Sequence, residues 1–479
     1  MRYIFLIVFS LISLSETFSQ CNFQFISRYD YPPFNSPLTN QIDKLGRPYL
    51  YVASNEFGLR IFKTNTGTPV LNNTLDTNDL FMRVMSVSQY DTLLYVAIGS
   101  HFDTATDDSP GMVIVSVADP ENPVILDNWI HSLPGMGTGM IVVEGDYAYV
   151  GGMTLGLFIL NISDPNSIYL EGNFLPTIDY PIINPPSTQY GMFNARGMEV
   201  KNKIVYLCYD RGGLRIVNCT NPNAPFESGR YVNPLVAANV PRAYNNIVLN
   251  DTVAYAAVDY CGVEILDIRD TSNIVLLDHY NPHNCPTGFW WTSPIHANEM
   301  HLVSDCNKLM VAGGKSEFNV LDVSDPNNVS YCGGFGSLTD TSGTWGMSFR
   351  NDTIYLSYVF SFNIAIISPF WAEDPGIRMI RWTDHCITSA EEIMSENKNF
   401  RIFPNPLSSN DTYLILEANH RFIGNLVEIY DLTGKCVYSS IVGNDGKLII
   451  KSLNFSESIY NVILHHEENV YSEKLMIVR

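Results

Sequence analysis

The feature that most limits how this chain can fold is a short apolar motif that recurs seven times. Its central position is occupied by Tyr51, Tyr95, Tyr149, Tyr206, Tyr255, Met310 and Tyr355. Successive copies lie between 44 and 57 residues apart. A period of this length is typical of repeat proteins, in which each copy is one small unit that buries its apolar faces against its neighbours.

Each copy is followed by a second apolar motif, represented by Gly58-Leu59-Arg60-Ile61. The further copies begin at Gly111, Gly156, Gly213, Gly262, Phe318 and Phe362. Before the last two copies, Glu317 and Ser361 stand where other copies have glycine. A turn such as Asp119-Pro120 comes next, since proline fixes φ and aspartate bonds the local backbone. With short strands on either side, the repeat predicts an all-β, seven-bladed β-propeller with four antiparallel strands per blade.

A strand-like segment, Phe23–Tyr29, precedes the first repeat. It could close the ring by pairing in the last blade, whose own outer strand is predicted at Ile377–Trp382. The sequence leaves open which of these two segments closes the propeller.

The composition supports a folded, strand-rich protein. Hydrophobic residues make up 46% of the chain and charged residues only 16%, while glycine and proline number 32 and 26. This mixture is typical of short strands joined by tight turns. The formal net charge is −21, so no nucleic-acid partner is expected, because phosphate binding requires a basic surface.

Residues 1–19 have the pattern of a secretory signal peptide, with an apolar run at Ile4–Ile12 and a predicted cleavage before Gln20. That run is too short to span a bilayer and no other stretch is long enough, so no transmembrane segment is expected. Cys21 follows Phe18-Ser19-Gln20, which lacks the small residue that lipoprotein processing needs. We therefore expect plain cleavage rather than lipidation.

Export into an oxidising compartment makes disulfides possible. The chain has nine cysteines, an odd number, and none forms a C-x-x-C pair. Zinc-ribbon and thioredoxin-like sites are therefore not expected. One or two disulfides and several buried free thiols are both compatible with the sequence, and the spacing does not give the pairing.

The motifs of the third repeat, Tyr149–Gly151, Gly156–Ile159 and Ser163–Pro165, represent the others. On these motifs, residues 22–385 resemble the LVIVD-repeat propellers of secreted and surface-exposed bacterial proteins. The resemblance implies a propeller domain, which we place at 20–385, and it brings no catalytic signature.

The pattern changes after the propeller. Residues 386–399 are polar and lack strand periodicity, so they are predicted to be a linker. Residues 400–479 contain short alternating runs such as Val427–Tyr430 and Ile459–Leu464. These runs predict a small C-terminal β-sandwich.

The C-terminal region contains a set of motif residues, namely Pro404, Asn405, Pro406, Asp431, Gly434, Lys435 and Tyr460. On these motifs it resembles the type A C-terminal sorting domain read by the type IX secretion machinery of Gram-negative bacteria. The resemblance implies an immunoglobulin-like sandwich, an interaction with that machinery, and a secreted or surface-attached protein associated with the outer membrane. Ser458 departs from the family, which usually has glycine there.

The loop between the second and third strands of blade 2 is longer than its equivalents and contains Asp103, Asp107 and Asp108. Three carboxylates within six positions could hold calcium through oxygen ligands. The alternative is a solvated acidic loop, because the spacing is not that of a known calcium loop. No other cofactor is expected.

Two long connections between blades offer candidate ligand-binding residues. The connection before Met300 contains His283, Trp290, Trp291 and His296, and an earlier one contains Tyr180. Exposed aromatic side chains favour binding, for example by stacking on a sugar. The alternatives are a transition-metal site built from the histidines and a purely structural cover over the propeller rim.

No nucleophile motif, zinc-protease motif or phosphate-binding glycine loop occurs in the chain. Glu199 and Glu299 could form an acid/base pair, although equivalence between blades favours a repeated structural role. We therefore expect a secreted or surface module that binds an extracellular protein or glycan, without catalysis. The alternative is a hydrolase or lyase of extracellular polymers with its site at the mouth of the propeller channel.

Overall fold

The computed structural model describes residues 21–32, 36–100, 108–177, 193–210, 212–233, 244–282, 295–314, 316–337, 343–359, 374–384, 400–403, 413–418, 422–431, 434–443, 446–451, 456, 458–466 and 469–477. The chain divides into two compact units, Met1–Cys386 and Ile387–Arg479. Among the residues given above, no helix combines the length and the apolar character that a membrane crossing requires.

The first unit is built from four-stranded antiparallel sheets, and its described residues form seven of them. Blades 1 to 3 consist of β2 (Asn40–Ile42), β3 (Tyr49–Ala53), β4 (Leu59–Lys63) and β5 (Val70–Leu75); β6 (Val84–Tyr90), β7 (Leu93–Ile98), β8 (Gly111–Ser116) and β9 (Val124–Ile130); and β10 (Ile141–Glu144), β11 (Tyr147–Gly151), β12 (Leu157–Asn161) and β13 (Tyr169–Phe174). Blades 4 and 5 consist of β14 (Met198–Lys201), β15 (Ile204–Cys208), β16 (Leu214–Asn218) and β17 (Phe226–Tyr231); and β18 (Tyr244–Asn250), β19 (Val253–Val258), β20 (Val263–Asp267) and β21 (Val275–Tyr280). Blades 6 and 7 consist of β22 (Met300–Val303), β23 (Lys308–Ala312), β24 (Phe318–Asp322) and β25 (Ser330–Phe335), with a 3-10 helix at Ser304–Cys306; and β26 (Thr344–Arg350), β27 (Thr353–Tyr358), β28 (Gly376–Trp382) and β1 (Phe23–Asp30).

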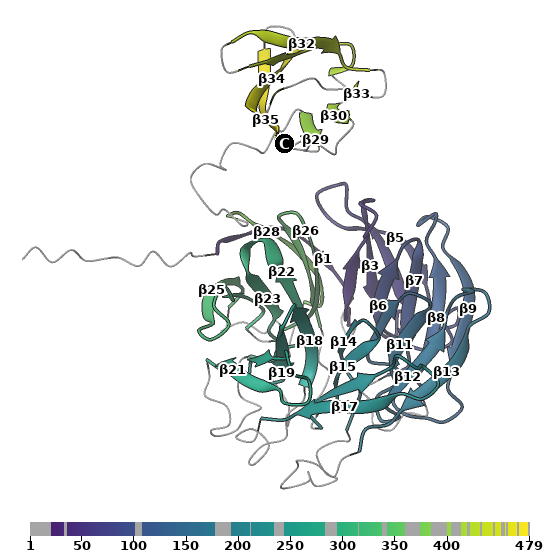
Figure 1. Ribbon diagram of the computed structural model, residues 1–479. Coiled ribbons are helices and arrows are strands. Elements are labelled where there is room, and N and C mark those ends of the chain that lie inside the picture. The colour runs from purple at the N-terminus through teal and green to yellow at the C-terminus, as the bar shows by residue number, and fades with distance from the viewer. Residues whose placement is uncertain are drawn as a thin grey trace, which may run out of the picture. The chain divides into compact units, whose positions relative to one another are not determined.

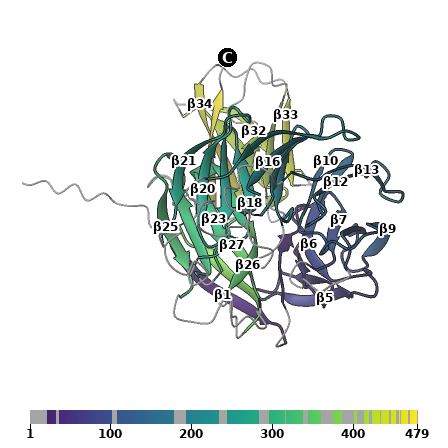
Figure 2. The same cartoon turned by 90° about the horizontal axis from the view of Figure 1, so that it is seen from below.

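The blades form a ring around their innermost strands. Strand β2 lies against both β6 and β26, while β10 lies between β6 and β14, and β18 lies between β14 and β22. Figures 1 and 2 show the sheets fanned around this common centre. The predicted seven-bladed propeller is therefore confirmed.

The ring is closed by the start of the chain. Strand β1 is the outermost strand of blade 7 and pairs with β28 so that Phe23 lies opposite Trp382. Strand β28 in turn pairs directly with β27, so it is the third strand and not the outer one. The prediction of Phe362–Ala365 as the third strand was wrong, since that position is filled by β28. Residues 362–365 lie outside the described part of the chain.

Neighbouring blades interlock through apolar side chains. Tyr51 and Ile61 of blade 1 pack with Val96 and Val113 of blade 2 in one cluster, and all four side chains are fully buried. Burying an apolar side chain of this size contributes roughly 1.5–3 kcal/mol. The repeated tyrosine motif therefore forms the core because its strand has neighbours on both faces.

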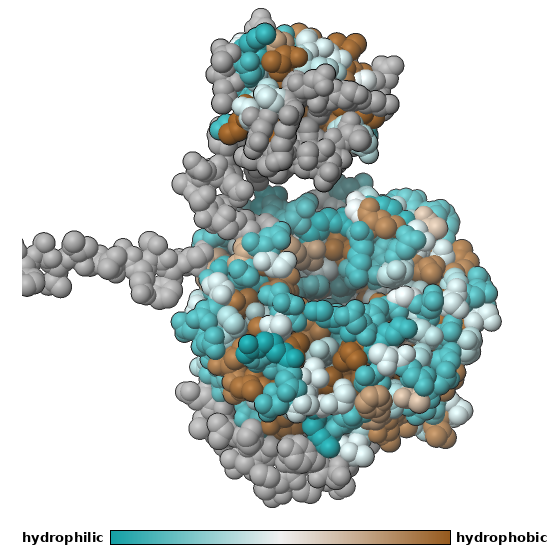
Figure 3. Space-filling model, in the orientation of Figure 1, coloured by the Kyte–Doolittle hydropathy of each residue, from teal (hydrophilic) through white to brown (hydrophobic). Residues whose placement is uncertain are grey.

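Outer strands have solvent on one side and carry exposed apolar residues at or near their first position. Examples are Val70, Val124, Tyr169, Phe226, Val275 and Tyr331. In Figure 3 apolar residues are interspersed with hydrophilic ones over the visible face of the propeller. Scattered exposed apolar residues of this kind are normal for a protein surface.

Each outer strand also touches the next blade at one repeated position, which we call the rim contact. The position lies opposite the middle of the third strand, as Gly229 lies opposite Ile216. The seven residues at this position are Asn73, Asp127, Gly172, Gly229, Asp278, Gly333 and Ser27. The two aspartates accept backbone N–H groups of the next blade, from Ile168 at 2.8 Å and Val329 at 2.7 Å.

Glycines occupy the rim contact where the two backbones approach most closely. A Cβ added at Gly229 would lie 1.8 Å from the carbonyl oxygen of Thr271 in the next blade. We therefore expect Gly229→Ala to destabilise the propeller by about 1–3 kcal/mol, because an extra carbon in a tight contact forces the backbones apart. Chemical denaturation would measure this change, and the neighbouring Ser228→Ala should change stability much less. Equal stability of the two variants would contradict the assigned contact.

The turn before the third strand needs a left-handed residue. Gly58, Gly156, Gly213 and Gly262 have φ between +71° and +84° at this position. In blade 6 the position is held by Glu317, with φ +55° and a fully buried side chain. A buried carboxylate in a left-handed conformation is costly, so its contacts must compensate.

The second unit is a sandwich of two sheets. One sheet has the order β29 (Phe400–Phe403), β30 (Tyr413–Ala418) and β33 (Lys447–Lys451), and the other β32 (Cys436–Ile441), β31 (Leu426–Tyr430), β34 (Ser458–His466) and β35 (Asn469–Ile477). Leu414 and Ile450 of the first sheet pack with Val427, Val462 and Leu475 of the second in a single buried cluster. This unit therefore has a core of its own.

Candidate functional site

One face of the propeller is formed by the turns between second and third strands. In five blades the turn bridges to the beginning of the next blade, through Asn55 to Val84, Met153 to Ala195, Asp210 to Tyr244, Asp259 to Ala297 and Gly314 to Thr344. These turns and the connections between blades therefore lie at the same end of the ring. We call this end the turn face.

A buried contact between a histidine and an aspartate lies on the turn face between blades 5 and 6. Nε2 of His296 pairs with a carboxylate oxygen of Asp259, and both side chains are buried. Nδ1 of His296 lies 2.7 Å from Oδ1 of Asn298, whose amide nitrogen donates to the carbonyl oxygen of Thr344 at 3.0 Å. The imidazole is thus held at both ring nitrogens, and the edge of the Tyr260 ring packs against it.

An ion pair between an arginine and an aspartate lies beside this contact of His296 and Asp259. Nε of Arg196 is 3.2 Å from Oδ2 of Asp210, and Asn194 donates to the same oxygen at 2.9 Å. Burial raises the pKa of Asp210, with Arg196 and Asn194 opposing that shift and the charge of Asp259 adding to it. The two carboxylates are therefore close enough to interact. We call Arg196, Asp210, Asp259, His296 and Asn298 the mouth cluster.

Half-buried titratable side chains line the inner strands below the mouth cluster. Glu199 of β14 lies opposite Tyr206, and His301 of β22 lies opposite Met310, so these two residues occupy the same repeat position. Glu299 instead corresponds to Gly197, since each precedes the methionine that begins its inner strand. The predicted equivalence of Glu199 and Glu299 was therefore wrong, because it ignored the two-residue offset.

These side chains come from different blades, and the charge of Lys44 acts on both Glu199 and His301. Burial raises the pKa of Glu199 to about 7, with Lys44 of blade 1 opposing the shift. Burial also lowers the pKa of Lys44 and of His301, and the charge of Lys44 lowers the latter further. Lys44 is nevertheless exposed to solvent.

The pKa of Glu299 is raised further than that of Glu199. Burial raises its pKa to about 8, although its Oε2 accepts the Met347 N–H at 2.8 Å. The unfolded chain loses this proton near its ordinary pKa of about 4.3. Between these two values the unfolded state is therefore favoured as the pH rises, by about 1.4 kcal/mol per unit.

We accordingly expect Glu299→Gln to stabilise the propeller by roughly 2–4 kcal/mol at pH 8 and to have little effect at pH 4.5. The glutamine oxygen can still accept from Met347, so the contact is retained. Denaturation curves at both pH values would measure the difference. If the stability of the variant changed with pH in the same way as that of the wild type, the raised pKa of Glu299 would be contradicted.

Most of the predicted ligand-binding residues lie outside the described residues, namely Tyr180, His283, Trp290 and Trp291. The exception is His296, which is buried with both ring nitrogens held in the mouth cluster. Direct contact of these five residues with a ligand stays a prediction.

The predicted calcium residues Asp103 and Asp107 also lie outside the described part of the chain. Asp108 is described, and its Oδ2 lies 3.8 Å from Nε of Arg83. Within the described ranges, no group of three or more His, Cys, Asp or Glu residues is arranged to hold a metal ion.

The predicted sorting residues Asp431, Gly434 and Lys435 form one tight turn between β31 and β32. Oδ1 of Asp431 accepts the Lys435 N–H at 3.0 Å, and the Asp431 carbonyl accepts the Gly434 N–H at 3.0 Å. Gly434 has φ +82°, which explains why glycine is used there. Tyr460 is buried and donates to the carbonyl oxygen of Ser456 at 3.0 Å. Residues 404–406 lie outside the described residues.

Sequence reasoning missed Arg196, Asp210, Asp259 and Asn298 of the mouth cluster. Asp210 and Asp259 occupy the turn position that holds Asn55 in blade 1 and Met153 in blade 3. Aligning the turns as well as the strands would have shown two consecutive blades with aspartate there. Their pairing with residues of neighbouring connections has no sequence signal.

Comparisons with known proteins agree with these two units. The family model for the LVIVD repeat matches residues 137–175 and 194–233, and that for the secretion system C-terminal sorting domain matches residues 401–478. No curated protein matches the chain.

Among solved structures, the chain is similar to U3-55K, with 8% identity, a TM-score of 0.52, and coverage of 75% of this chain and 98% of that one. It is also similar to the WD40 repeats of RRP9, with 8% identity, a TM-score of 0.51, and coverage of 75% and 97%. At this identity the likeness shows the propeller fold alone. The chain thus carries LVIVD repeats in its β-propeller and a match to the secretion system C-terminal sorting domain at residues 401–478.

Proposed function

We propose that this protein is an exported binding module that takes an extracellular protein or glycan on the turn face of its propeller. The proposal rests on the convergence of polar groups from blades 4, 5 and 6 in the mouth cluster. Trp345 of blade 7 is partly buried and its ring lies 6.3 Å from that of His296. Converging polar groups beside an aromatic side chain at the mouth of a fold are typical of a binding site.

The predicted aromatic residues shortly precede, in the sequence, two described segments of the mouth cluster. Residues 295–298 follow the connection that contains Trp290 and Trp291, and residues 194–196 follow the one that contains Tyr180. Both following segments contribute to the mouth cluster. The cluster therefore supports the ends of the connections that carry the proposed ligand contacts.

A glycan array probed with the full-length secreted protein, with and without calcium, tests this function. Binding should be lost in Trp290→Ala/Trp291→Ala and weakened in Asp259→Asn, which removes the charge opposite His296. Asp305→Asn, at an exposed position in the 3-10 helix, is the matched control. Binding that survives both site variants would show that the ligand does not bind at the turn face. An array without any binding would exclude the sampled glycans as ligands.

The channel favours a second candidate function, hydrolysis or elimination on an extracellular polymer. A carboxyl group with a pKa of about 7 holds its proton at neutral pH and can give it up, as a general acid or base must. Glu199 is the candidate for this role. Loss of polysaccharide depolymerisation in Glu199→Gln, with an unchanged fold, would favour this candidate, and an inactive wild type on a broad polymer panel would remove it.

A further inference from the structure

The rim contact between blades 6 and 7 differs from the rim contacts between the other neighbouring blades. We call each boundary between neighbouring blades a seam. At the other seams, the third and fourth strands of the next blade are joined by a turn that meets the rim contact, as Thr271 of blade 5 meets Gly229. Blade 7 has no such turn, because its fourth strand comes from the beginning of the chain. In place of a turn, Cys21 meets the rim contact of blade 6: its carbonyl oxygen would lie 2.1 Å from a Cβ added at Gly333.

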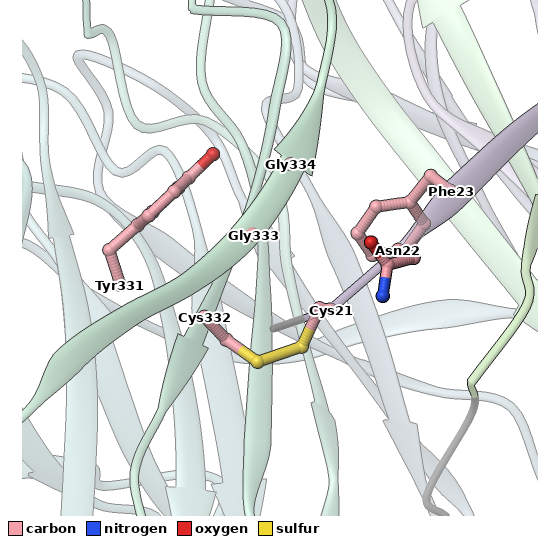
Figure 4. Close-up of a pocket in the computed structure, with 7 residues that line it drawn as sticks. All are labelled: Cys21, Asn22, Phe23, Tyr331, Cys332, Gly333 and Gly334. Atoms are coloured by element: carbon pink, nitrogen blue, oxygen red, sulfur yellow. A yellow bond between two sulfur atoms is a disulfide. The ribbon is translucent and has the colours of Figure 1, made fainter. Parts of the chain in front are cut away.

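At the contact between blades 6 and 7, Cys21 is bonded covalently. It forms a disulfide with Cys332 of β25 across 311 residues of sequence, and its N–H donates to the Cys332 carbonyl at 2.9 Å. Figure 4 shows the disulfide beside Gly333 and Gly334. A pocket of about 460 Å³ adjoins it, lined in part by Cys21, Cys332 and Tyr331.

The next residues attach the beginning of the propeller to its end. The Asn22 N–H donates to Oδ1 of Asp384 at 2.8 Å, and the Asn22 carbonyl accepts the Thr383 N–H at 2.9 Å. The Phe23 ring packs against Phe318 of blade 6 and Trp382 of blade 7. Residues 21–23 therefore join the two last blades to each other.

We infer that the disulfide of Cys21 locks the first strand of the chain into the propeller ring and that the Cys21 sulfur is therefore not the site of an N-terminal lipid anchor. Lipidation would form a thioether on Sγ of Cys21, the atom that is bonded to Sγ of Cys332. The lock forms when the two thiols lose two protons and two electrons. A disulfide donor of the thiol–disulfide oxidoreductase class accepts them and becomes a dithiol. The pocket beside the bond is large enough for a small-molecule reductant.

Peptide mapping of the full-length secreted protein, alkylated before digestion without reduction, tests the chemistry. The expected product is a peptide that contains Cys21 linked to one that contains Cys332. A diacylglyceryl group on Cys21, or an alkylated Cys21 thiol in most molecules, would overturn the inference.

Hydrogen exchange tests the lock itself. In Cys332→Ser, the amides of β1 should exchange at least tenfold faster, while those of β26 and β27 change little, because only β1 loses its covalent attachment. Cys436→Ser removes an exposed free thiol of the second unit and is the matched control. Unchanged exchange in β1, or equal acceleration in every blade, would refute a local lock.

Native wild-type protein treated with a reductant gives a complementary test without a substitution, and it opens the disulfides of Cys261 and Cys306 as well. Exchange in β1 should rise on reduction and return on reoxidation. Exchange in β1 that does not respond to reduction would count against the lock even if the variant failed to fold.

Discussion

Arg378→Ala should destabilise the propeller by about 3–5 kcal/mol, the cost of removing one partner of a buried ion pair. Nη1 of Arg378 lies 3.2 Å from Oε2 of Glu317, whose side chain has no solvent exposure. The same carboxylate accepts the Tyr358 hydroxyl and the Ser337 N–H. The Arg378 guanidinium lies 3.8 Å from the centre of the Tyr358 ring, so the substitution also removes a cation–π contact.

The matched control for this prediction is Arg381→Ala on the same strand. Arg381 pairs with Asp352 at 3.1 Å, but half of its side chain is exposed, so its loss should cost no more than about 1 kcal/mol. Equilibrium denaturation of the two variants measures the difference. Equal stability losses would mean that Glu317 and Arg378 do not depend on each other.

Glu317→Gly extends the test, because glycine is the residue at this turn in four other blades. The substitution removes the strained left-handed glutamate but leaves Arg378 without that carboxylate. We expect a smaller loss of stability than in Arg378→Ala, and the two losses should not add in the double variant because the residues are in contact. Strict additivity would argue against their coupling.

Removing residues 400–479 should retain the propeller inside the cell while leaving it folded. The second unit has its own buried cluster, and its sequence matches the secretion system sorting domain. In a host with type IX secretion, immunoblots of medium and cell fractions should show the extracellular signal fall to background. The cell-associated propeller should keep the thermal stability of the full-length protein.

A substitution within the sorting turn separates folding of the tail from its recognition. Asp431→Ala removes the carboxylate that holds the Lys435 N–H and should reduce export, whereas exposed Lys435→Ala leaves the turn intact and reports on recognition alone. Normal secretion of the truncated chain would contradict the role of the tail. A truncated propeller that unfolds would show instead that the two units depend on each other.

The sequence predicted the blades well because their signal is repeated. The tyrosine strands occupy the second position of every blade, as Tyr149 does in β11. The exception was the third strand of blade 7. Gly376-Ile377-Arg378-Met379 resembles the Gly58-Leu59-Arg60-Ile61 motif, but it lies much further from its tyrosine than other copies do. The shorter distance to Phe362 was therefore preferred.

The site was harder to predict because it depends on contacts between blades. The sequence pointed to His296 because its loop is rich in histidine and tryptophan. Its partner Asp259, however, belongs to a turn in the preceding blade. The Cys21–Cys332 disulfide likewise joins the beginning of the propeller to blade 6. Neither pairing leaves a local pattern, since only the closed ring brings these residues together.

The placement of β1 sets the order in which the propeller can be completed. Phe23 lies near the beginning of the described chain but finds its partner only at Trp382, after every other blade has been made. Until then β28 is an open edge, and contacts of such large sequence separation form slowly. An unfinished propeller thus exposes a strand able to pair with another chain. Chaperone protection of this one edge during export would reduce misassembly more than protection of any other blade.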